Sequence, residues 1–516
     1  MRRGSWTWTG ILSLIALALG AGVSGPAFSC ADPTFLWEKS YNAPANGVDE
    51  ANGVVIDSSG NIFVVGSETR TDLAEASNWL VRKYDAAGTL LWSSTYNYAG
   101  ASVDVAEEVA LDSSGNIVVA GFANWVSNAS GSFVTRKYDT NGHLLWSRTY
   151  NPLGVNDDHM AIAVDVDPSG NAYVVGYEDR ADLGQGPNWR ILKYSSAGAL
   201  VWATSYNGSS QDQAIDVRTD PSGNVIVGGW VNGGTGGWLL RKYDSAGSLV
   251  WSKAGSSVTG TPDACYGLET TSAGGIYAVG RESVGGEGMN WLVQKWDAGG
   301  NLLWSRSHNG PANNNDIAKA VRIIADGSIV VVGYEMFNGS NENWLMKSYD
   351  SNGALLWSRT IAPVTPEYDE AMDVSSGSDG SFVVVGYDNV AGQNHNWRIQ
   401  KYSCPLPSNS GSSITPPPAP TEAKGMYVYP HPLKCPGGNA VFEMEKAGTA
   451  TLRIVNMRGQ VVKTVTRDVA ASPRAEVFLD CTLVKNGAYL IQGELKYADG
   501  TTVRLKPYKF VVAGDR

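Results

Sequence analysis

The sequence predicts an all-β fold, a seven-bladed β-propeller followed by a small β-sandwich. The main observation is a repeat of 49 to 56 residues, a period that suits one propeller blade. A segment that ends in Trp, as in LLWS, occurs seven times, at Trp37, Trp92, Trp146, Trp202, Trp251, Trp304 and Trp357. The 60 Gly and 18 Trp among 516 residues agree with many short strands joined by tight turns.

Each repeat divides into four expected strands, A to D. In the first repeat these are Asp49–Asp57, Asn61–Gly66, Asn78–Asp85 and Leu90–Asn97. Short turns that contain Gly join A to B and C to D, whereas the B–C and D–A links are longer. The long links therefore leave from one face of the ring, called the long-loop face, and functional residues on β scaffolds are usually found on such loops.

The ends of the repeat predict how the ring closes. The chain opens on a lone D strand, Leu36–Asn42, and the last repeat is a lone A-B-C set, Asp369–Ser403. Seven complete blades result only if the first strand completes the last blade. This three-plus-one closure leaves no unpaired strand edge at the seam.

The repeat also resembles known families. Its D-x-A…D-x-x-G-N…V-V-G core resembles the β-propeller repeats of secreted bacterial proteins, and Lys83–Trp92 (KYDAAGTLLW) resembles the tryptophan-docking repeat of quinoprotein-like propellers. The resemblance covers about residues 32–404 and implies the fold, but not an activity. Quinoprotein dehydrogenases often carry an adjacent Cys pair. This chain has none, so we expect a structural Trp and no quinone cofactor.

The first 29 residues are typical of a signal peptide. Arg2 and Arg3 precede an apolar core, Ile11–Val23, that is too short to span a bilayer. Small residues allow cleavage after Ser29 or after Ala31, so Cys30 is lipidated, disulfide-bonded or removed. We expect no transmembrane segment and a protein that is secreted or on the outer cell surface of a Gram-negative bacterium.

The C-terminal region begins after a Ser- and Pro-rich linker. We place the propeller at residues 30–405, the linker at 406–424 and a β-sandwich at 425–516. The segments Leu452–Thr464 and Leu483–Leu495 resemble the C-terminal sorting domain of type IX secretion cargo and a related immunoglobulin-like module. The resemblance implies an outer-membrane secretion machinery as partner; a purely structural β module is the alternative.

The cysteines suggest two disulfides. Alignment of the repeats places Cys30 and Cys404 at the C–D corner of the closing blade, where they either form a disulfide that staples the ring or remain two free thiols. Cys435 and Cys481 fall in the C-terminal domain and form a second candidate pair. Cys265 takes a position that is Ala in other repeats, which predicts a small buried side chain.

Acidic residues recur at the long-loop ends of strands A and B and form a predicted acidic ring. Its members, as candidate binding residues, are Asp49, Glu68, Asp104, His159, Glu178, Asp212, Asp263, Glu282, Asp316, Glu335, Asp369 and Asp388. In four blades two carboxylates are expected to face each other, which suits Ca²⁺. These candidate calcium ligands are Asp49, Glu68, Asp263, Glu282, Asp316, Glu335, Asp369 and Asp388.

A structural reading of this ring is that each Asp accepts bonds from backbone N–H groups and each Glu lies on a solvated rim. Aromatic residues just before the acids either stack on sugars or pack between blades. They are Tyr177, Tyr334, Tyr387, Phe122 and Trp230.

Charge and motifs limit the possible functions. A formal net charge of −11 argues against nucleic acid or anionic lipid as partners. The chain has no H-E-x-x-H, G-x-S-x-G, P-loop or C-x-x-C motif. We expect a monomeric, non-enzymatic propeller that binds protein or glycan through its long-loop face. The alternatives are an extracellular polysaccharide hydrolase or lyase with carboxylates at the channel mouth, and a structural envelope protein.

Overall fold

The computed structural model divides the chain into two units, Met1–Ser408 and Asn409–Arg516, and each is described by itself. In the first unit it describes residues 30, 32–98, 101–125, 131–151, 158–208, 211–232, 237–255, 263–337, 341–361 and 368–404. In the second it describes residues 426–429, 433–434, 437–444, 446–456, 461–469, 472–480, 487–497 and 502–513. The predicted signal peptide, linker and Cys435–Cys481 pair lie outside the described residues.

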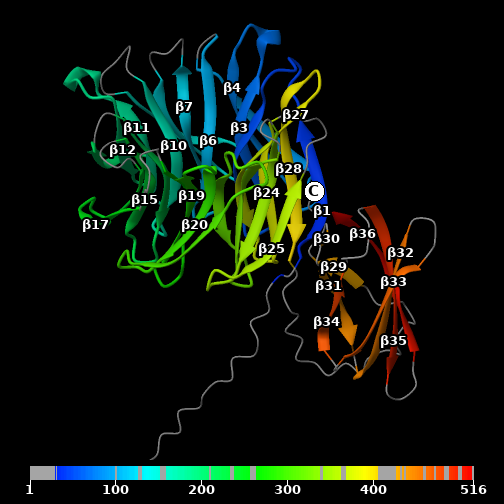
Figure 1. Ribbon diagram of the computed structural model, residues 1–516. Helices are drawn as coiled ribbons and strands as arrows, with labels where there is room; N and C mark the ends of the chain where they lie inside the picture. Colours follow the sequence, from blue (N-terminus) through cyan, green and yellow to red (C-terminus); the bar gives the residue numbers. More distant parts are fainter. Residues whose placement is uncertain are drawn as a thin grey trace, which may run out of the picture. The chain divides into compact units, whose positions relative to one another are not determined.

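Within these ranges the first unit consists of seven antiparallel sheets of four strands each (Figure 1). The first three are β2 (Glu50–Ile56), β3 (Ile62–Thr69), β4 (Ser77–Tyr84), β5 (Leu90–Tyr96); β6 (Val103–Leu111), β7 (Ile117–Trp125), β8 (Ser132–Tyr138), β9 (Leu144–Tyr150); and β10 (His159–Val166), β11 (Ala172–Asp179), β12 (Pro187–Tyr194), β13 (Leu200–Tyr206). The next three are β14 (Asp212–Thr219), β15 (Val225–Val231), β16 (Gly237–Tyr243), β17 (Leu249–Ala254); β18 (Ala264–Thr270), β19 (Ile276–Val284), β20 (Gly288–Trp296), β21 (Leu302–His308); and β22 (Ile317–Ile323), β23 (Ile329–Met336), β24 (Glu342–Tyr349), β25 (Leu355–Ile361).

The seventh sheet joins the two ends of this unit. It has the order β1 (Thr34–Tyr41), β28 (Asn394–Ser403), β27 (Ser381–Val390), β26 (Glu370–Ser376). Strand β1 pairs antiparallel with β28 along its length, from Thr34 opposite Ser403 to Tyr41 opposite Trp397. The prediction that the first strand completes the last sheet is therefore confirmed.

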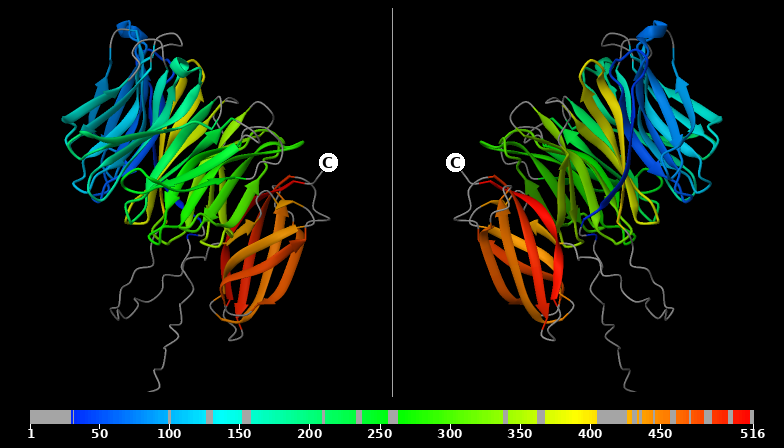
Figure 2. Two further views of the ribbon diagram at one scale, coloured as in Figure 1. Left: turned by 90° about the vertical axis from the view of Figure 1, so that its left-hand side faces the viewer. Right: turned by 90° about the vertical axis from the view of Figure 1, so that its right-hand side faces the viewer.

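The inner strands form a closed ring. Strands β2, β6, β10, β14, β18, β22 and β26 each contact the inner strand of the next sheet, and β26 contacts β2. The sheets follow one another around this ring (Figures 1 and 2). The all-β, propeller-like fold expected from the repeat is confirmed.

In six of the seven sheets a tryptophan of the outer strand fastens its sheet to the next. Its indole N–H donates to a carbonyl in the C–D turn of the following sheet; for example, Trp146 donates to Ser196 (3.1 Å). A lysine of strand C donates to the same carbonyl, as Lys137 does (3.4 Å). Both contacts recur at six of the seven sheet interfaces. The accepting carbonyls are those of Ala86, Thr140, Ser196, Ser245, Ala298 and Ser351.

The seventh interface differs because the closing sheet has no continuous C–D turn. A disulfide between Cys30 and Cys404 occupies this corner, with a Cα–Cα distance of 5.5 Å, which confirms the predicted staple. The corresponding tryptophan, Trp357, belongs to the same buried cluster as both cysteines. Among the described residues its indole nitrogen has no hydrogen-bond partner, so packing replaces the docking bond here.

The second unit contains two sheets in its described part. One has the order β29 (Met426–Tyr429), β31 (Gly437–Met444), β34 (Ser472–Asp480). The other has the order β30 (Leu433–Lys434), β36 (Thr502–Ala513), β35 (Gly487–Tyr497), β32 (Gly448–Asn456), β33 (Val461–Val469). Side chains of both sheets, including Leu452, Val477 and Ile491, share one buried core.

Helical structure is minor in the described chain. Two short 3-10 helices, η1 (Thr71–Leu73) and η2 (Ala181–Leu183), follow β3 and β11. In the described ranges, no helix has the length and apolar character needed to cross a bilayer. The predicted burial of Cys265 is confirmed, since its side chain is completely buried in β18.

Alanine at the docking corner should be costly. Gly198 has a φ of +81°, and a Cβ there would lie 2.8 Å from the Trp146 ring. Gly184, the control, has a φ of +65° and open space around it. Gly184→Ala should lose about 1 kcal/mol of unfolding free energy from backbone strain alone. Gly198→Ala should lose about 3 kcal/mol, because the docked ring must also shift. Equal losses in denaturant titrations would contradict the docking account.

Candidate functional site

In the six repeats that carry it, a buried aspartate lies at or just before the start of the inner strand and holds the long links in place. One carboxylate oxygen accepts a hydrogen bond from the backbone N–H twenty residues later, where strand B ends, at 2.7 to 3.2 Å. The six pairs are Asp49 with Thr69, Asp104 with Asn124, Asp212 with Asn232, Asp263 with Ser283, Asp316 with Met336, and Asp369 with Asn389.

The second oxygen of several of these aspartates holds the preceding D–A link. In the first two sheets it accepts from Ala43 N (2.6 Å) and Tyr98 N (2.7 Å). Asp212 and Asp316 likewise accept from backbone N–H groups of Gly208 and Gly310. These bonds correspond to the structural reading of the ring, in which the aspartates satisfy loop backbone groups.

The structure brings the four predicted carboxylate pairs close together. In each pair burial is the largest cause that raises the pKa of the Asp, and the acid of strand B raises this pKa further. Burial and Glu68 are among the causes that raise the pKa of Asp49 to about 6. Burial and Asp388 likewise raise the pKa of Asp369 to about 7.

Three glutamates of the ring contact the neighbouring sheet through polar side chains and do not form a solvated rim. Glu68 accepts from the Tyr41 hydroxyl, and Glu178 from the Tyr150 hydroxyl (3.2 Å). Glu335 lies 3.1 Å from Nε2 of His308. In every case the partner comes from the outer strand of the preceding sheet. The expectation of a solvated rim is therefore wrong for these three, which are 1 to 7% exposed.

The remaining ring residues show where the repeat varies. His159 is completely buried and lies opposite Glu178 in the strand register, as predicted. Asp212 lies opposite Val231. Across the described chain, no group of three or more His, Cys, Asp or Glu is arranged to hold a metal ion. The calcium assignment stays a prediction.

The aromatic residues before the acids are mostly inside the protein. Tyr177, Tyr334, Tyr387 and Phe122 are 4 to 8% exposed, and Trp230 is half-buried. The Tyr387 ring stacks on His395 with a centroid distance of 4.3 Å. This burial agrees with packing between sheets.

A cavity of about 240 Å³, the upper cavity, lies inside the ring of inner strands, nearer the long-loop face. Every inner strand contributes to its lining the third residue after the ring Asp or His. These residues are Asn52, Glu107, Ile162, Ile215, Tyr266, Lys319 and Met372. None of the acidic-ring residues lines it.

A β-bulge turns this third residue toward the channel. In each inner strand the register skips one residue, for example Ile162 between Ala161 and Ala163. The bulge brings the strand A backbone against a glycine of strand B, so that a Cβ at Gly176 would lie 1.9 Å from the Met160 carbonyl oxygen. The Gly of the V-V-G motif is thus required by the bulge that exposes the cavity residue.

Charged groups in the upper cavity come from different sheets. Burial, followed by the charge of Glu50, raises the pKa of Glu107 to about 8. Burial, followed by Asp373, raises the pKa of Glu108. Neither carboxyl group has a hydrogen-bond or ion-pair partner among the described residues. Asp216, in contrast, pairs with Arg218 at 2.8 Å.

Lys319, which lines the cavity, also belongs to a cluster between the sixth and seventh sheets, here called the Lys319 cluster. Lys319 pairs with Glu370 at 2.8 Å. Burial, followed by the charge of Glu370, raises the pKa of Glu342 to about 8.

The same cluster reaches the first sheet. Burial, followed by the charge of Glu370, raises the pKa of Tyr387, whose ring stacks on His395. His395 lies 2.8 Å from Glu50, and this hydrogen bond is the largest cause that raises the pKa of the imidazole. The cluster can therefore donate and accept protons as well as bind charged groups.

Sequence reasoning missed the Lys319 cluster and the upper cavity. The available signal was variation: the third position after the ring residue is Asn, Glu, Ile, Ile, Tyr, Lys and Met in the seven repeats. A position that varies inside a regular repeat is not needed by the repeated packing, so it is free to serve a site. The acidic ring follows the repeat because it fastens the loops.

No protein-family model matches this chain. No curated protein matches it either. Among solved structures, it is similar to Sqt1 from Chaetomium thermophilum (10% identity, 71% of this chain and 98% of that chain, TM-score 0.40). It is also similar to a protein of unknown function from Dyadobacter fermentans (11%, 72% and 99%, 0.44) and to a puromycin hydrolase (12%, 79% and 61%, 0.43).

Loss of a ring aspartate should destabilise the protein with or without calcium. Asp316→Ala leaves the N–H groups of Gly310 and Met336 without their acceptor, and should lower the unfolding free energy by about 2–3 kcal/mol. Glu282→Gln is the control. Thermal melts in millimolar Ca²⁺ and in chelator should show the same loss. A Ca²⁺-dependent stabilisation of the wild type that Asp316→Ala abolishes would contradict this account.

The raised pKa of Glu107 predicts a pH-dependent stability. The raised pKa keeps the Glu107 proton on the folded protein up to about pH 8, whereas the unfolded chain loses it near the ordinary carboxyl pKa of 4.5. The unfolding free energy should therefore fall as pH rises through this interval. In urea titrations, Glu107→Gln should match the wild type near pH 4.5 and exceed it by about 1 kcal/mol at pH 8. A difference that does not change with pH would contradict a raised Glu107 pKa.

Proposed function

We propose that this chain is an exported binding protein, a seven-bladed propeller that recognises a protein or glycan at the long-loop end of its channel. The observation that carries this proposal is the Lys319 cluster beside the upper cavity. Lys319 interrupts the seven-fold repeat and lines the cavity together with Glu107, whose pKa is raised to about 8, and Lys319 pairs with Glu370.

The chemistry of the site favours a ligand with a positively charged group. Acidic residues outnumber basic ones in the lining of the upper cavity, with Glu107, Glu108, Asp216 and Asp373 against Lys319 and Arg218. A bound amine would offset the charge of these carboxylates, which reduces the cost of burying them. The volume of about 240 Å³ lies below the range of pockets that take up whole small ligands and suits one side chain or one sugar residue.

Export is supported by the disulfide and by the chain's two ends. A disulfide between Cys30 and Cys404 persists in oxidising compartments. The signal-peptide pattern and the resemblance to type IX sorting domains agree with a destination outside the cell. In this proposal the second unit is an immunoglobulin-like sandwich that binds the outer-membrane secretion machinery.

The hydrolase or lyase alternative fits the site less well. A glycosidase needs two free carboxyl groups, one as acid and one as base or nucleophile. Glu370 is paired with Lys319 at 2.8 Å, and the ring aspartates are bonded to backbone N–H groups of the loops. A structural envelope protein would not need the variation at the third inner-strand position.

A ligand screen tests the proposal. The secreted protein is applied to glycan and peptide arrays that include amino sugars and lysine-rich peptides. Glu370→Gln should weaken binding of the best ligand at least about tenfold, as expected for a lost buried charge contact. The control Glu282→Gln lies outside the cavity and should bind like the wild type. Retained affinity in Glu370→Gln, or product release from a glycan, would overturn the binding assignment.

A further inference from the structure

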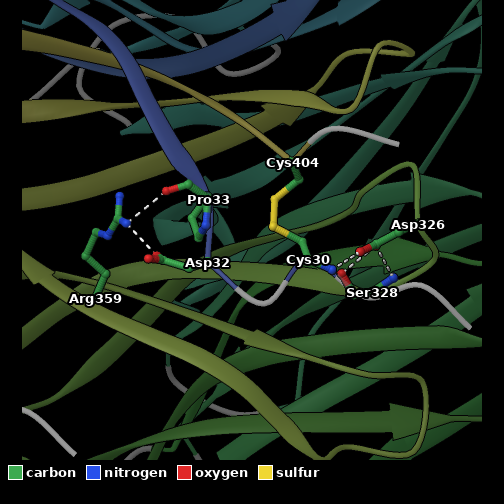
Figure 3. The surroundings of a disulfide bond; sticks show 7 residues. All are labelled: Cys30, Asp32, Pro33, Asp326, Ser328, Arg359 and Cys404. Carbon is green, nitrogen blue, oxygen red and sulfur yellow. Dashed lines mark hydrogen bonds and ion pairs between the residues drawn. A yellow bond between two sulfur atoms is a disulfide. The ribbon is translucent and has the colours of Figure 1, made fainter. Parts of the chain in front are cut away.

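The first described residue of the chain lies against a carboxylate of the sixth sheet. The turn between β22 and β23 contains Asp326, whose Oδ1 accepts from Ser328 N (2.9 Å) and Ser328 Oγ (2.6 Å). Its Oδ2 accepts from the backbone nitrogen of Cys30 at 2.6 Å. Figure 3 shows Asp326 directed at this nitrogen beside the disulfide.

This contact is specific to the seam. The neighbouring turn, between β26 and β27, has the same local geometry: Asp379 Oδ1 accepts from Ser381 N (2.9 Å) and Ser381 Oγ (2.6 Å). In the described part of the chain, Asp379 accepts no hydrogen bond from a backbone N–H of another segment. The turn itself therefore does not require a donor such as Cys30.

We infer that Cys30 is the first residue of the mature protein and that Asp326 binds its α-ammonium group. The sequence allows cleavage after Ser29 or after Ala31. Cleavage after Ala31 would remove Cys30 and leave Cys404 without its disulfide partner. Hydrolysis of the Ser29–Cys30 bond leaves a carboxylate on Ser29 and an amine on Cys30, which takes up a proton beside Asp326. This inference rests on the proposed export.

The rest of the new N-terminus is also held in place. Asp32 pairs with Arg359 at 2.7 Å, and Arg359 also donates to the Pro33 carbonyl (2.9 Å) (Figure 3). The segment before β1 is therefore fixed through its amine, its disulfide and Arg359. With the thiol in a disulfide and the amine bound to Asp326, neither group remains for lipidation.

The first test identifies the N-terminus. The full chain is exported by a Gram-negative host, and the product is analysed by N-terminal sequencing and intact mass. After reduction it is treated with an aromatic nitrile that condenses with 1,2-aminothiols. We expect Cys30 as the first residue and one nitrile adduct. A start at Phe28 or Asp32, or an acylated cysteine, overturns the inference alone; a start at Met1 also contradicts the proposed export.

The second test measures the ion pair. Two chains are compared, one starting at Cys30 and one with Ser29 retained, so that an amide replaces the ammonium group. In the chain that starts at Cys30, Asp326→Asn should lower the melting temperature about 2 °C more than the matched Asp379→Asn. This excess should be lost when Ser29 is retained. An equal excess in both chains would show that Asp326 binds only a backbone N–H and would overturn the inference.

Discussion

The pairing of β1 with β28 is the constraint on which the propeller-like unit depends. Inner-strand contacts join every sheet to the next, and Trp docking reinforces six of the seven interfaces. These contacts form a closed ring only if the first strand completes the last sheet. Closing a loop this long costs conformational entropy. The Cys30–Cys404 disulfide, which spans 374 residues, reduces this cost by restricting the unfolded chain.

Two sets of repeated contacts surround the channel. On the long-loop side, buried aspartates hold the ends of the links; on the opposite side, Trp and Lys dock on the next C–D turn. Because these repeated positions hold the sheets together, the bulged residue of the inner strand can differ from sheet to sheet. The side chains that face the channel therefore differ around the ring, and we place the binding site there for this reason.

Much of the fold could be predicted from the sequence because the residues that form it recur at the same positions in each repeat. The strands, the closure by β1 and the Cys30–Cys404 bond all follow from the alignment of repeats. The upper cavity could not be predicted in this way, because a bulge shifts the alternation of side chains by one residue, and periodicity alone does not show which of Ala161, Ile162 or Ala163 faces the channel. The ring aspartates were located correctly, but their partners are backbone N–H groups of links whose lengths vary, and a sequence does not show where such groups lie.

The most direct test of the closure is hydrogen exchange with and without a reductant. Among the strands of the closing sheet, β1 depends most on the disulfide to stay paired, because it comes from the opposite end of the unit's sequence. Reduction should lower the protection of amides in β1 and in the facing edge of β28, while β11 and β12 keep theirs. Unchanged protection of β1 after complete reduction of Cys30–Cys404, or an equal loss in all seven sheets, would contradict the role assigned to this seam.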